Sequence, residues 1–463
     1  DKVPVKYPGL DPWQIWISES QERMTMSIPP EKVDAFMELM KRRGVEAWVV
    51  GEFNDSGKCE VTYNGDKIMD LELSFLHDGL PPKTLTTTYT KVTHDEPNME
   101  CPADLTDTLN TMMGRLNLAS FEFVSHQYDH VVQGEMIVGP FHGKGKVNGH
   151  ASVMAPVLDS TKGVVVSQAI NAKYSDIDTY HMAACAIDSA IRNVVSIGGP
   201  LDHLALMDNF CWCSSNEEER LGQLKEAARG CYDFATAYGT PFISGKDSMF
   251  NDFKGYDEDG NSVKISVPPT LLVSSLAVMP DYRKTVTLDV KFPGDLVYVV
   301  GETSDELGAS EYFEELGFIG NNIPKVDAKK NMKVYRAVER AISEGLVVSC
   351  ESVLLGGLGV ALARKSIAGQ LGLDISLENL PVNGEVSRPD YLLFSESQGR
   401  LVMSVNPSKK DEFEALFTGL SFAQIGTVRE DEKFVLKGLE GQTVIDTDVA
   451  TLDKNYRLTF KGF

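Results

Sequence analysis

A ten-residue segment occurs twice in this chain, and it constrains the fold more than any other feature. Residues 18–27 read Ser-Glu-Ser-Gln-Glu-Arg-Met-Thr-Met-Ser, and residues 395–404 read Ser-Glu-Ser-Gln-Gly-Arg-Leu-Val-Met-Ser. A proline, a charged helix start and an apolar-periodic stretch follow each copy. Self-similarity of this kind marks a repeated structural unit, since the same apolar pattern has to be buried in the same way. The chain is therefore predicted to contain one type of domain twice.

The two copies differ in what precedes them. Before Ser395, a strand at 295–300 and helices near 331–344 and 358–367 are predicted, whereas Ser18 follows only a short segment. A domain that lacks half of its core exposes a large apolar patch. We therefore expect the first copy to be the rear part of a domain, and we expect a missing N-terminal segment or a partner subunit to supply the rest.

A different kind of unit separates the two copies. Strands are predicted around 147–155 and 163–170, and long helices over 179–197 and 217–238. The strands do not alternate regularly with the helices, so the expected fold class is mixed α/β (α+β). We predict three domains: a partial domain, a complete domain of a second type, and a complete copy of the first type, at residues 1–95, 96–282 and 283–463.

Composition excludes several classes of function. The chain has 463 residues, with 44 Lys and Arg against 67 Asp and Glu, a formal charge of -23. Such a charge repels phosphate backbones and anionic lipid, so neither nucleic acid nor a membrane surface is an expected partner. The sequence shows no membrane-spanning run and no signal peptide, and its seven cysteines fit reduced thiols. A soluble, cytoplasmic protein is expected. The close cysteine pair in Cys211-Trp212-Cys213 is predicted to be a buried strand or loop end.

One segment is the strongest candidate for chemistry. Ser244-Gly245-Lys246-Asp247-Ser248 is predicted as a loop that follows an apolar stretch. Glycine allows a close approach of backbone N–H groups to an anion, Lys246 adds a positive charge, and Asp247 is a candidate Mg²⁺ ligand. Asp208 follows another apolar run and is predicted at a strand end, where ligands gather in α/β sheets. An ordinary turn and a solvated acid remain the alternatives.

Three weaker segments also carry polar groups in an unusual arrangement. Residues 18–21 offer hydroxyl, carboxylate and amide groups for a ribose or an amide-bearing substrate, unless the repeat is a structural turn. The glycine-rich residues 355–359, Leu-Gly-Gly-Leu-Gly, are predicted either to bind a phosphate at a helix start or to allow close packing of a helix. His126 and His130 are candidate metal ligands, but packing of an ordinary loop is the alternative explanation for them. Together these residues indicate a phosphate or nucleotide ligand.

Several segments in order resemble the formylglycinamide ribonucleotide amidotransferase family, the phosphoribosylformylglycinamidine synthases of purine biosynthesis. The resemblance lies in residues 18–24, 127–130, 138–140, 191–193, 208–209, 239–248, 292–295 and 301–303. It implies domains like those of aminoimidazole ribonucleotide synthetase, with this chain similar to the second half of the doubled enzyme plus the tail of the first. It also implies an ATP-dependent C–N ligase that converts formylglycinamide ribonucleotide to the amidine with ammonia, and ATP and Mg²⁺ as cofactors.

The resemblance assigns roles residue by residue. It implies that substrate is bound by Glu19, Ser20, Gln21 and Ser248. It implies that ATP is contacted by Asp208 and Gly245. Lys246 stands where shorter family members place a metal-binding asparagine, which leaves Asp247 and Asn193 as candidate metal ligands.

Some family features are replaced or absent. Ser189, Ala151 and Leu355 stand where the family usually has acids, so a second nucleotide site built from those acids is not expected. The family's catalytic histidines lie outside this chain, and no glutaminase domain is seen in it. We therefore expect partners: the missing N-terminal synthetase segment or subunit, and a glutaminase subunit or domain as ammonia source. A homodimer is left open.

The expected function is a part of this synthetase that is inactive by itself. A non-catalytic scaffold half of such an enzyme is the first alternative, because the lost acids suit a half that only supports an active partner. Another superfamily enzyme, such as selenophosphate synthetase or thiamine monophosphate kinase, is the second, although the duplicated segment argues against it.

Overall fold

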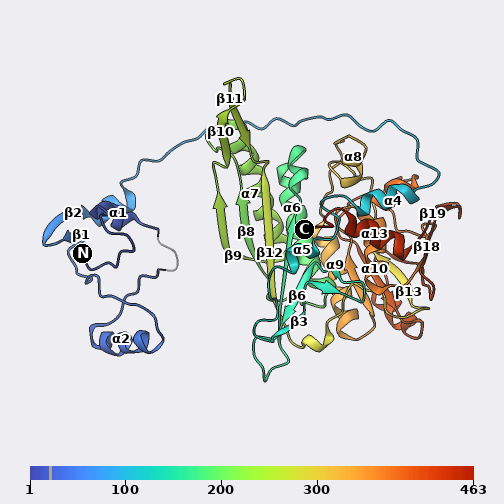
Figure 1. Cartoon of the computed structure of the whole chain (residues 1–463), viewed down its shortest axis with the longest axis horizontal. Coiled ribbons are helices and arrows are strands. Elements are labelled where there is room, and N and C mark those ends of the chain that lie inside the picture. Colours follow the sequence, from blue (N-terminus) through green and yellow to red (C-terminus); the bar gives the residue numbers. More distant parts are fainter. Residues whose placement is uncertain (20–22) are drawn as a thin grey trace. The chain divides into compact units, whose positions relative to one another are not determined.

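The computed structural model describes residues 1–19 and 23–463, and the chain divides into two compact units, 1–85 and 86–463. Both are shown in Figure 1. The first unit contains a two-stranded antiparallel sheet, β1 (Lys58–Tyr63) and β2 (Asp66–Glu72). Its helices are α1 (Pro12–Ile17), η1 (Pro30–Lys32), α2 (Val33–Arg42) and α3 (Leu73–Asp78).

The described residues of the first unit lack a buried core. Trp13, Trp16 and Phe53 are 60%, 54% and 85% exposed, which agrees with the expected apolar surface near the start of the chain. The predicted helix after the first copy is present as η1 and α2. It ends before Gly44, whose φ of +69° places it in the left-handed region that favours glycine.

The second unit contains a six-stranded sheet in the order β3-β6-β7-β12-β8-β9. Most neighbours are antiparallel, but β8 and β9 are parallel, so the sheet is mixed. The strands are β3 (Met136–Val138), β6 (Ala151–Met154), β7 (Gly163–Ile170), β12 (Thr270–Met279), β8 (Ala205–Cys211) and β9 (Phe242–Ser248). The β7 bounds match the predicted strand.

A seven-stranded sheet follows, in the order β14-β16-β13-β17-β15-β18-β19. The strands are β14 (Ser349–Ser352), β16 (Leu401–Val405), β13 (Leu296–Val300), β17 (Phe422–Val428), β15 (Leu373–Ser376), β18 (Lys433–Lys437) and β19 (Thr443–Asp448). The second copy of the repeat ends in the buried strand β16, which lies between β14 and β13. The repeat therefore sits in the core of its domain.

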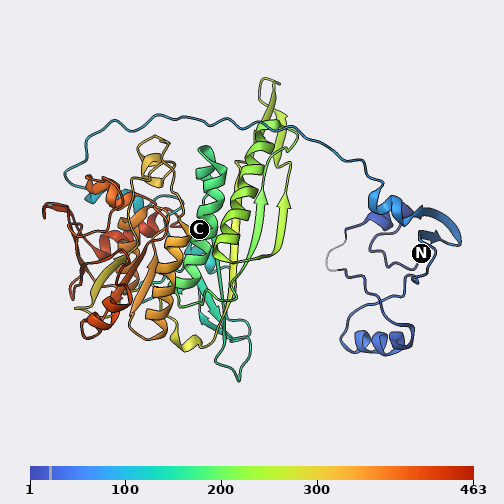
Figure 2. The ribbon, with the colours of Figure 1, turned by 180° about the vertical axis from the view of Figure 1, so that it is seen from behind.

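Helix α6 (Thr179–Ser196) is the central helix of the second unit. It packs against β7 and β12 on one side and against α9 (Ala328–Ser343) and β14 on the other. Nearly all of its residues are buried, because apolar and small side chains occur on every face. Figure 2 shows α6, α7 (Glu218–Tyr238) and the sheets from behind. The predicted helices 179–197 and 217–238 are confirmed within a residue.

The remaining elements of the second unit are short or lie around the two sheets. The helices are α4 (Thr106–Met113), α5 (Glu122–Ser125), η2 (Ala172–Asp176), η3 (Tyr282–Lys284), α8 (Glu311–Glu315), α10 (Gly357–Gly369), α11 (Pro389–Phe394), η4 (Pro407–Lys409), α12 (Lys410–Leu416) and α13 (Val449–Leu458). The strands are β4 (Phe141–His142), β5 (Val147–Asn148), β10 (Asp252–Tyr256) and β11 (Ser262–Ser266).

An extended segment, residues 86–105, runs over the second unit (Figure 1). Thr88 N donates to Glu218 O of α7 at 3.1 Å, and Leu105 N donates to Val444 O of β19 at 2.7 Å. Gly222 of α7 lies directly under this segment, since a Cβ there would stand 1.9 Å from Thr88 O. The segment thus joins the two halves of the unit, and we refer to it as the strap.

Candidate functional site

Strands β8 and β9 bring five of the predicted site residues to one edge of the six-stranded sheet. In their parallel register, Asp208 pairs with Gly245, Asn209 with Lys246, and Cys211 with Ser248. Two local predictions are wrong. Residues 244–248 lie in a strand rather than a loop, and Asp208 lies inside β8 rather than at its end. The apolar stretches before both segments simply continue as strands, because neighbouring strands satisfy their backbone groups.

One face of this edge carries Asp208, Gly245 and Asp247. A Cβ on Gly245 would lie 2.5 Å from Asp208 Oδ1. The Asp208 carboxylate therefore lies over the Gly245 backbone, and only glycine leaves room for it. Partial burial raises the pKa of Asp208, and the nearby negative charge of Asp247 raises it further. This face therefore presents two carboxylates beside an open stretch of backbone.

The opposite face carries Lys246 and Ser248, because side chains alternate along a strand. The Lys246 ammonium donates to the Ser248 hydroxyl and lies 3.4 Å from the backbone oxygen of Asp247. Within the described ranges, no carboxylate forms a salt bridge with Lys246. An ammonium and a hydroxyl at an exposed strand are suited to hold a phosphate or another oxyanion.

The candidate metal ligands do not all come together. Asn193 lies on α6 and donates through Nδ2 to Gln168 O of β7 at 3.3 Å, while β12 and β8 lie between β7 and the strand of Asp247. The described residues contain no group of three or more His, Cys, Asp or Glu that would hold a metal ion. Mg²⁺ commonly needs only one or two carboxylates plus substrate phosphates. Asp208 and Asp247 fit that requirement.

The second copy of the repeat is an internal, fully paired segment. Glu396 is completely buried and accepts from Tyr174 Oη at 2.5 Å, Gly356 N at 2.8 Å and Glu311 N at 3.0 Å. Burial raises the pKa of its carboxyl to about 7. Gln398 accepts from Ser189 Oγ on α6 at 3.0 Å. This copy therefore has the structural role that the sequence left open.

The first copy lies in the unit 1–85. Glu19 is exposed. Ser20 and Gln21 lie outside the described residues, so their predicted substrate contacts stay predictions.

The glycine-rich segment 355–359 opens α10. Gly356 and Gly357 have φ of +78° and +71°, and a Cβ on Gly357 would lie 2.5 Å from Ser395 O. Close packing against the second copy of the repeat thus explains these glycines. Leu355 and Ser189, two of the positions that lack the family's acids, line a cavity of about 250 Å³.

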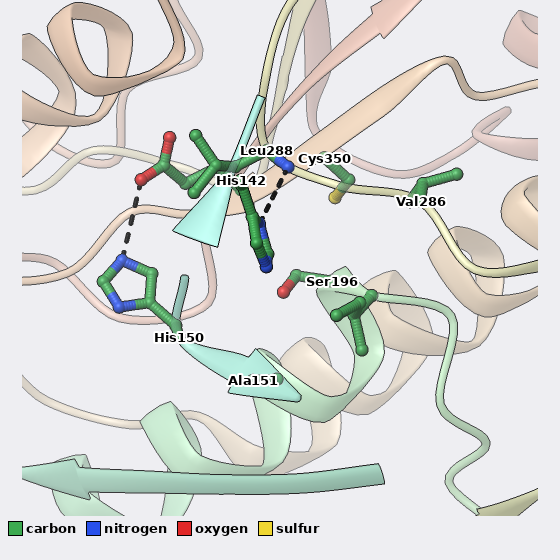
Figure 3. Close-up of a pocket in the computed structure, with 9 residues that line it drawn as sticks. His142, His150, Ala151, Ser196, Val286, Leu288 and Cys350 are labelled. Atoms are coloured by element: carbon green, nitrogen blue, oxygen red, sulfur yellow. Dashed lines mark hydrogen bonds and ion pairs between the residues drawn. The ribbon is translucent and has the colours of Figure 1, made fainter. Parts of the chain in front are cut away.

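A smaller cavity contains residues that sequence reasoning missed (Figure 3). His142 Nδ1 accepts from Leu288 N at 3.4 Å, and His150 Nε2 lies 3.6 Å from Glu351 Oε1. Burial lowers the pKa of His142 to about 4, so this ring is neutral near pH 7. The cavity of about 10 Å³ accommodates at most one water molecule. No local motif joins these residues, since about 200 positions separate the histidines from Glu351.

The other candidate histidines pack in a loop region. His126 contacts the Phe141 ring with centroids 4.8 Å apart, and its Nε2 lies 3.7 Å from Glu122 Oε1. His130 lies against the same ring with centroids 6.2 Å apart. This packing supports the loop interpretation over a metal site.

Among the described residues, no helix is both long enough and apolar enough to cross a bilayer. Over the same residues, all seven cysteines are free thiols.

Two family models match the chain. The model of the AIR synthase related protein, C-terminal domain, matches residues 1–64 and 293–438, and that of the N-terminal domain matches residues 149–267. The C-terminal model thus matches around both copies of the repeat. Together the two models cover more than half of the chain.

Curated relatives match along nearly the whole chain. Phosphoribosylformylglycinamidine synthase subunit PurL of Thermococcus sibiricus is 31% identical over 457 residues, 98% of this chain and 60% of the relative. The subunit of the same name from Methanocaldococcus jannaschii is 29% identical over 99% of this chain and 60% of the relative. The chain therefore spans about 60% of the length of these relatives.

Solved structures share the fold at lower sequence identity. Thermotoga maritima PurL complexed with FGAR has a TM-score of 0.55 and 19% identity over 74% of this chain and 52% of that one. The structure of PurLQS from Thermotoga maritima gives a TM-score of 0.53 and 19% identity over 68% of this chain and 47% of that one. The mixed α/β fold with domains of these two types is thus confirmed.

Proposed function

The chain belongs to the AIR synthase related proteins, and on that premise we propose that it is part of an ATP-dependent synthetase of purine biosynthesis. The proposed reaction converts formylglycinamide ribonucleotide to the amidine with ammonia. The relatives named phosphoribosylformylglycinamidine synthase subunit PurL support this reaction, and so does the neighbour solved with FGAR. The neighbours complexed with ATP and ADP support nucleotide binding.

The proposed chemistry requires stabilisation of phosphoryl oxygens. ATP phosphorylates the amide oxygen of the substrate, and ammonia then displaces the phosphate at that carbon. Charge develops on the phosphoryl group during transfer, so positioned cations and donors lower the barrier. Mg²⁺, when bound, would supply such charge, and Asp208 and Asp247 are the residues of this chain that fit it.

The observation that carries the proposal is the placement of Asp208 over Gly245 at the β8–β9 edge. Both residues were assigned to ATP from the resemblance, and they are in register although 37 positions separate them in the sequence. Ser248, with Lys246 beside it, is the proposed substrate contact at the end of β9. Glu19, Ser20 and Gln21 are proposed as further substrate contacts.

Several expectations remain part of the proposal. We propose the domain bounds 1–95, 96–282 and 283–463, which rest on the sequence alone. We propose that a further synthetase segment or subunit completes the site and that a glutaminase subunit or domain supplies ammonia, so the chain alone is expected to be inactive. A homodimer and a cytoplasmic location stay predictions of the sequence.

The test is ammonia-dependent ATP turnover on the ribonucleotide by this chain combined with the remaining synthetase segment of its longer relatives. Asp208→Asn is expected to raise KM for ATP by roughly tenfold, the effect of one charge-assisted contact. Ser248→Ala is expected to raise KM for the ribonucleotide instead. Asp257→Asn, in the exposed β10–β11 turn, is the matched control for Asp208→Asn and should leave both values unchanged.

The outcomes separate the candidate functions. If turnover appears and survives Asp208→Asn, Ser248→Ala and Gln21→Ala together, the chain is a non-catalytic scaffold. If the combined protein turns over ATP only with a different acceptor, another superfamily reaction is indicated.

A further inference from the structure

The turn that follows β9 has an unusual backbone. Phe250 has a φ of +60°, in the left-handed region, where a bulky non-glycine residue is a genuine outlier. Strained backbone of this kind persists only when the surrounding contacts hold it, and it clusters at functional sites. Ser248, the proposed substrate contact, lies two residues before this position.

Asn251 forms the contacts that close the turn. Its Nδ2 donates to Ser248 O at 2.6 Å and to Cys211 Sγ at 3.4 Å, and its backbone N donates to Trp212 O at 3.0 Å. Trp212 N also donates to Ser248 O, at 2.8 Å. The carbonyl of Ser248 is therefore held by two donors, and one of them is the side-chain amide of Asn251.

The segment Cys211–Trp212–Cys213 is the platform on which this turn rests. Trp212 is fully buried, and its indole Nε1 donates to Arg220 O of α7 at 3.0 Å. Phe250 N donates to Cys213 O at 3.4 Å. The segment therefore contacts the turn through its backbone groups and through the Cys211 sulfur.

We propose that Asn251 is a positioning residue for substrate binding, which acts by holding the Ser248 carbonyl and thereby aiming the Ser248 hydroxyl. The inference rests on the proposed function. Lys246 donates to that same hydroxyl, so the hydroxyl is fixed between the turn on one side and the ammonium on the other. Of the residues proposed to bind substrate or nucleotide, the Asn251 side chain forms a hydrogen bond only with Ser248 among the described residues.

The substitution Asn251→Asp isolates this role. Aspartate has nearly the shape of asparagine, but its carboxylate cannot donate to a carbonyl and repels the Ser248 oxygen. Asn216→Asp adds the same charge at an exposed position before α7 and is the matched control. Phe250→Gly relieves the left-handed backbone while Asn251 is kept, so it should retain substrate affinity.

The experiment is a double-mutant cycle of Asn251→Asp and Ser248→Ala in the chain combined with the remaining segment of its relatives. Each single change is expected to raise KM for the ribonucleotide roughly tenfold, the scale of one lost hydrogen bond, and the double variant no more than Ser248→Ala alone. KM for ATP should stay within about twofold, since the ATP residues occupy the other face. Urea unfolding of each variant checks the fold, and Asn251→Ala repeats the test if Asn251→Asp does not fold.

The cycle separates the failure of this inference from the failure of the proposed function. If the two effects multiply, or if KM for ATP rises equally, Asn251 only stabilises the fold and the inference is overturned. If Ser248→Ala itself leaves KM for the ribonucleotide unchanged, the proposed substrate role of Ser248 is wrong, and the positioning role of Asn251 is overturned with it.

Discussion

Replacement of Glu396 by glutamine is expected to change how the stability of the protein depends on pH. Glu396 is fully buried in the second copy of the repeat, and burial raises the pKa of its carboxyl from the ordinary 4.5 to about 7. Between these two values the folded protein keeps a proton that the unfolded chain releases. The contribution of this group to the free energy of unfolding is therefore full below pH 4.5 and is lost as the pH rises through 7.

The size of the effect follows from the pKa difference. At about 1.4 kcal/mol for each pH unit, a rise from 4.5 to about 7 corresponds to about 3 kcal/mol. Glutamine carries no titrating proton and keeps an oxygen that accepts from Gly356 N and Glu311 N. Relative to the wild type, Glu396→Gln should therefore gain up to about 3 kcal/mol in going from pH 4.5 to pH 8.

Urea unfolding of both proteins, followed by tryptophan fluorescence in steps from pH 4.5 to pH 8, measures this difference. Glu378→Gln, at an exposed position, is the matched control. Its free energy of unfolding, plotted against pH, should run parallel to that of the wild type. If the wild-type and Glu396→Gln curves also run parallel to within about 0.5 kcal/mol over this range, the carboxyl of Glu396 titrates at an ordinary pKa and the reasoning from burial is refuted.

Three further predictions concern packing and the site. Gly222→Ala would normally stabilise a helix by about 1 kcal/mol, but the new Cβ would stand 1.9 Å from Thr88 O. The strap must then move away from α7, so we expect faster proteolysis within the strap. Unchanged cleavage would contradict that contact. Asp188→Ala should cost about 3–5 kcal/mol in urea unfolding, because it leaves the buried Arg192 guanidinium without its charge partner; a cost below about 1 kcal/mol would show that water replaces the carboxylate. Gly245→Ala places a Cβ 2.5 Å from Asp208 Oδ1, so ATP affinity should fall about tenfold in the combined synthetase while urea stability changes little; unaltered affinity would exclude Asp208 from the nucleotide site.

Local sequence patterns were sufficient for several regular elements of the second unit. The strand 163–170 and the helices 179–197 and 217–238 lie where predicted, because short-range periodicity and glycine positions decide where such elements begin and end. Sequence reasoning failed at 244–248, where glycine and charged residues predicted a loop. The neighbouring strand β8 turned that segment into a strand, which is a tertiary effect on a weak local preference.

The candidate site shows the same division. Asp208, Gly245 and Ser248 were selected from their motifs, but the register of β8 and β9 decided that Asp208 faces Gly245. The alternation of side chains along β9 placed Ser248 beside Lys246. The buried His142 and Glu351 carry no local motif and were missed. Asn251 was also missed as a positioning residue, since an asparagine after a strand is an ordinary turn residue until its partner is known.

The sequence by itself determined the repeat, the mixed fold class and the resemblance to the synthetase family, because these rest on identities and periodicities along the chain. Only the tertiary structure decided that the second Ser-Glu-Ser-Gln segment is buried and paired rather than open to a ligand. The reason is physical: burial and charge depend on groups such as Tyr174 and Gly356, which are distant in sequence and meet Glu396 only after the sheets have packed around α6.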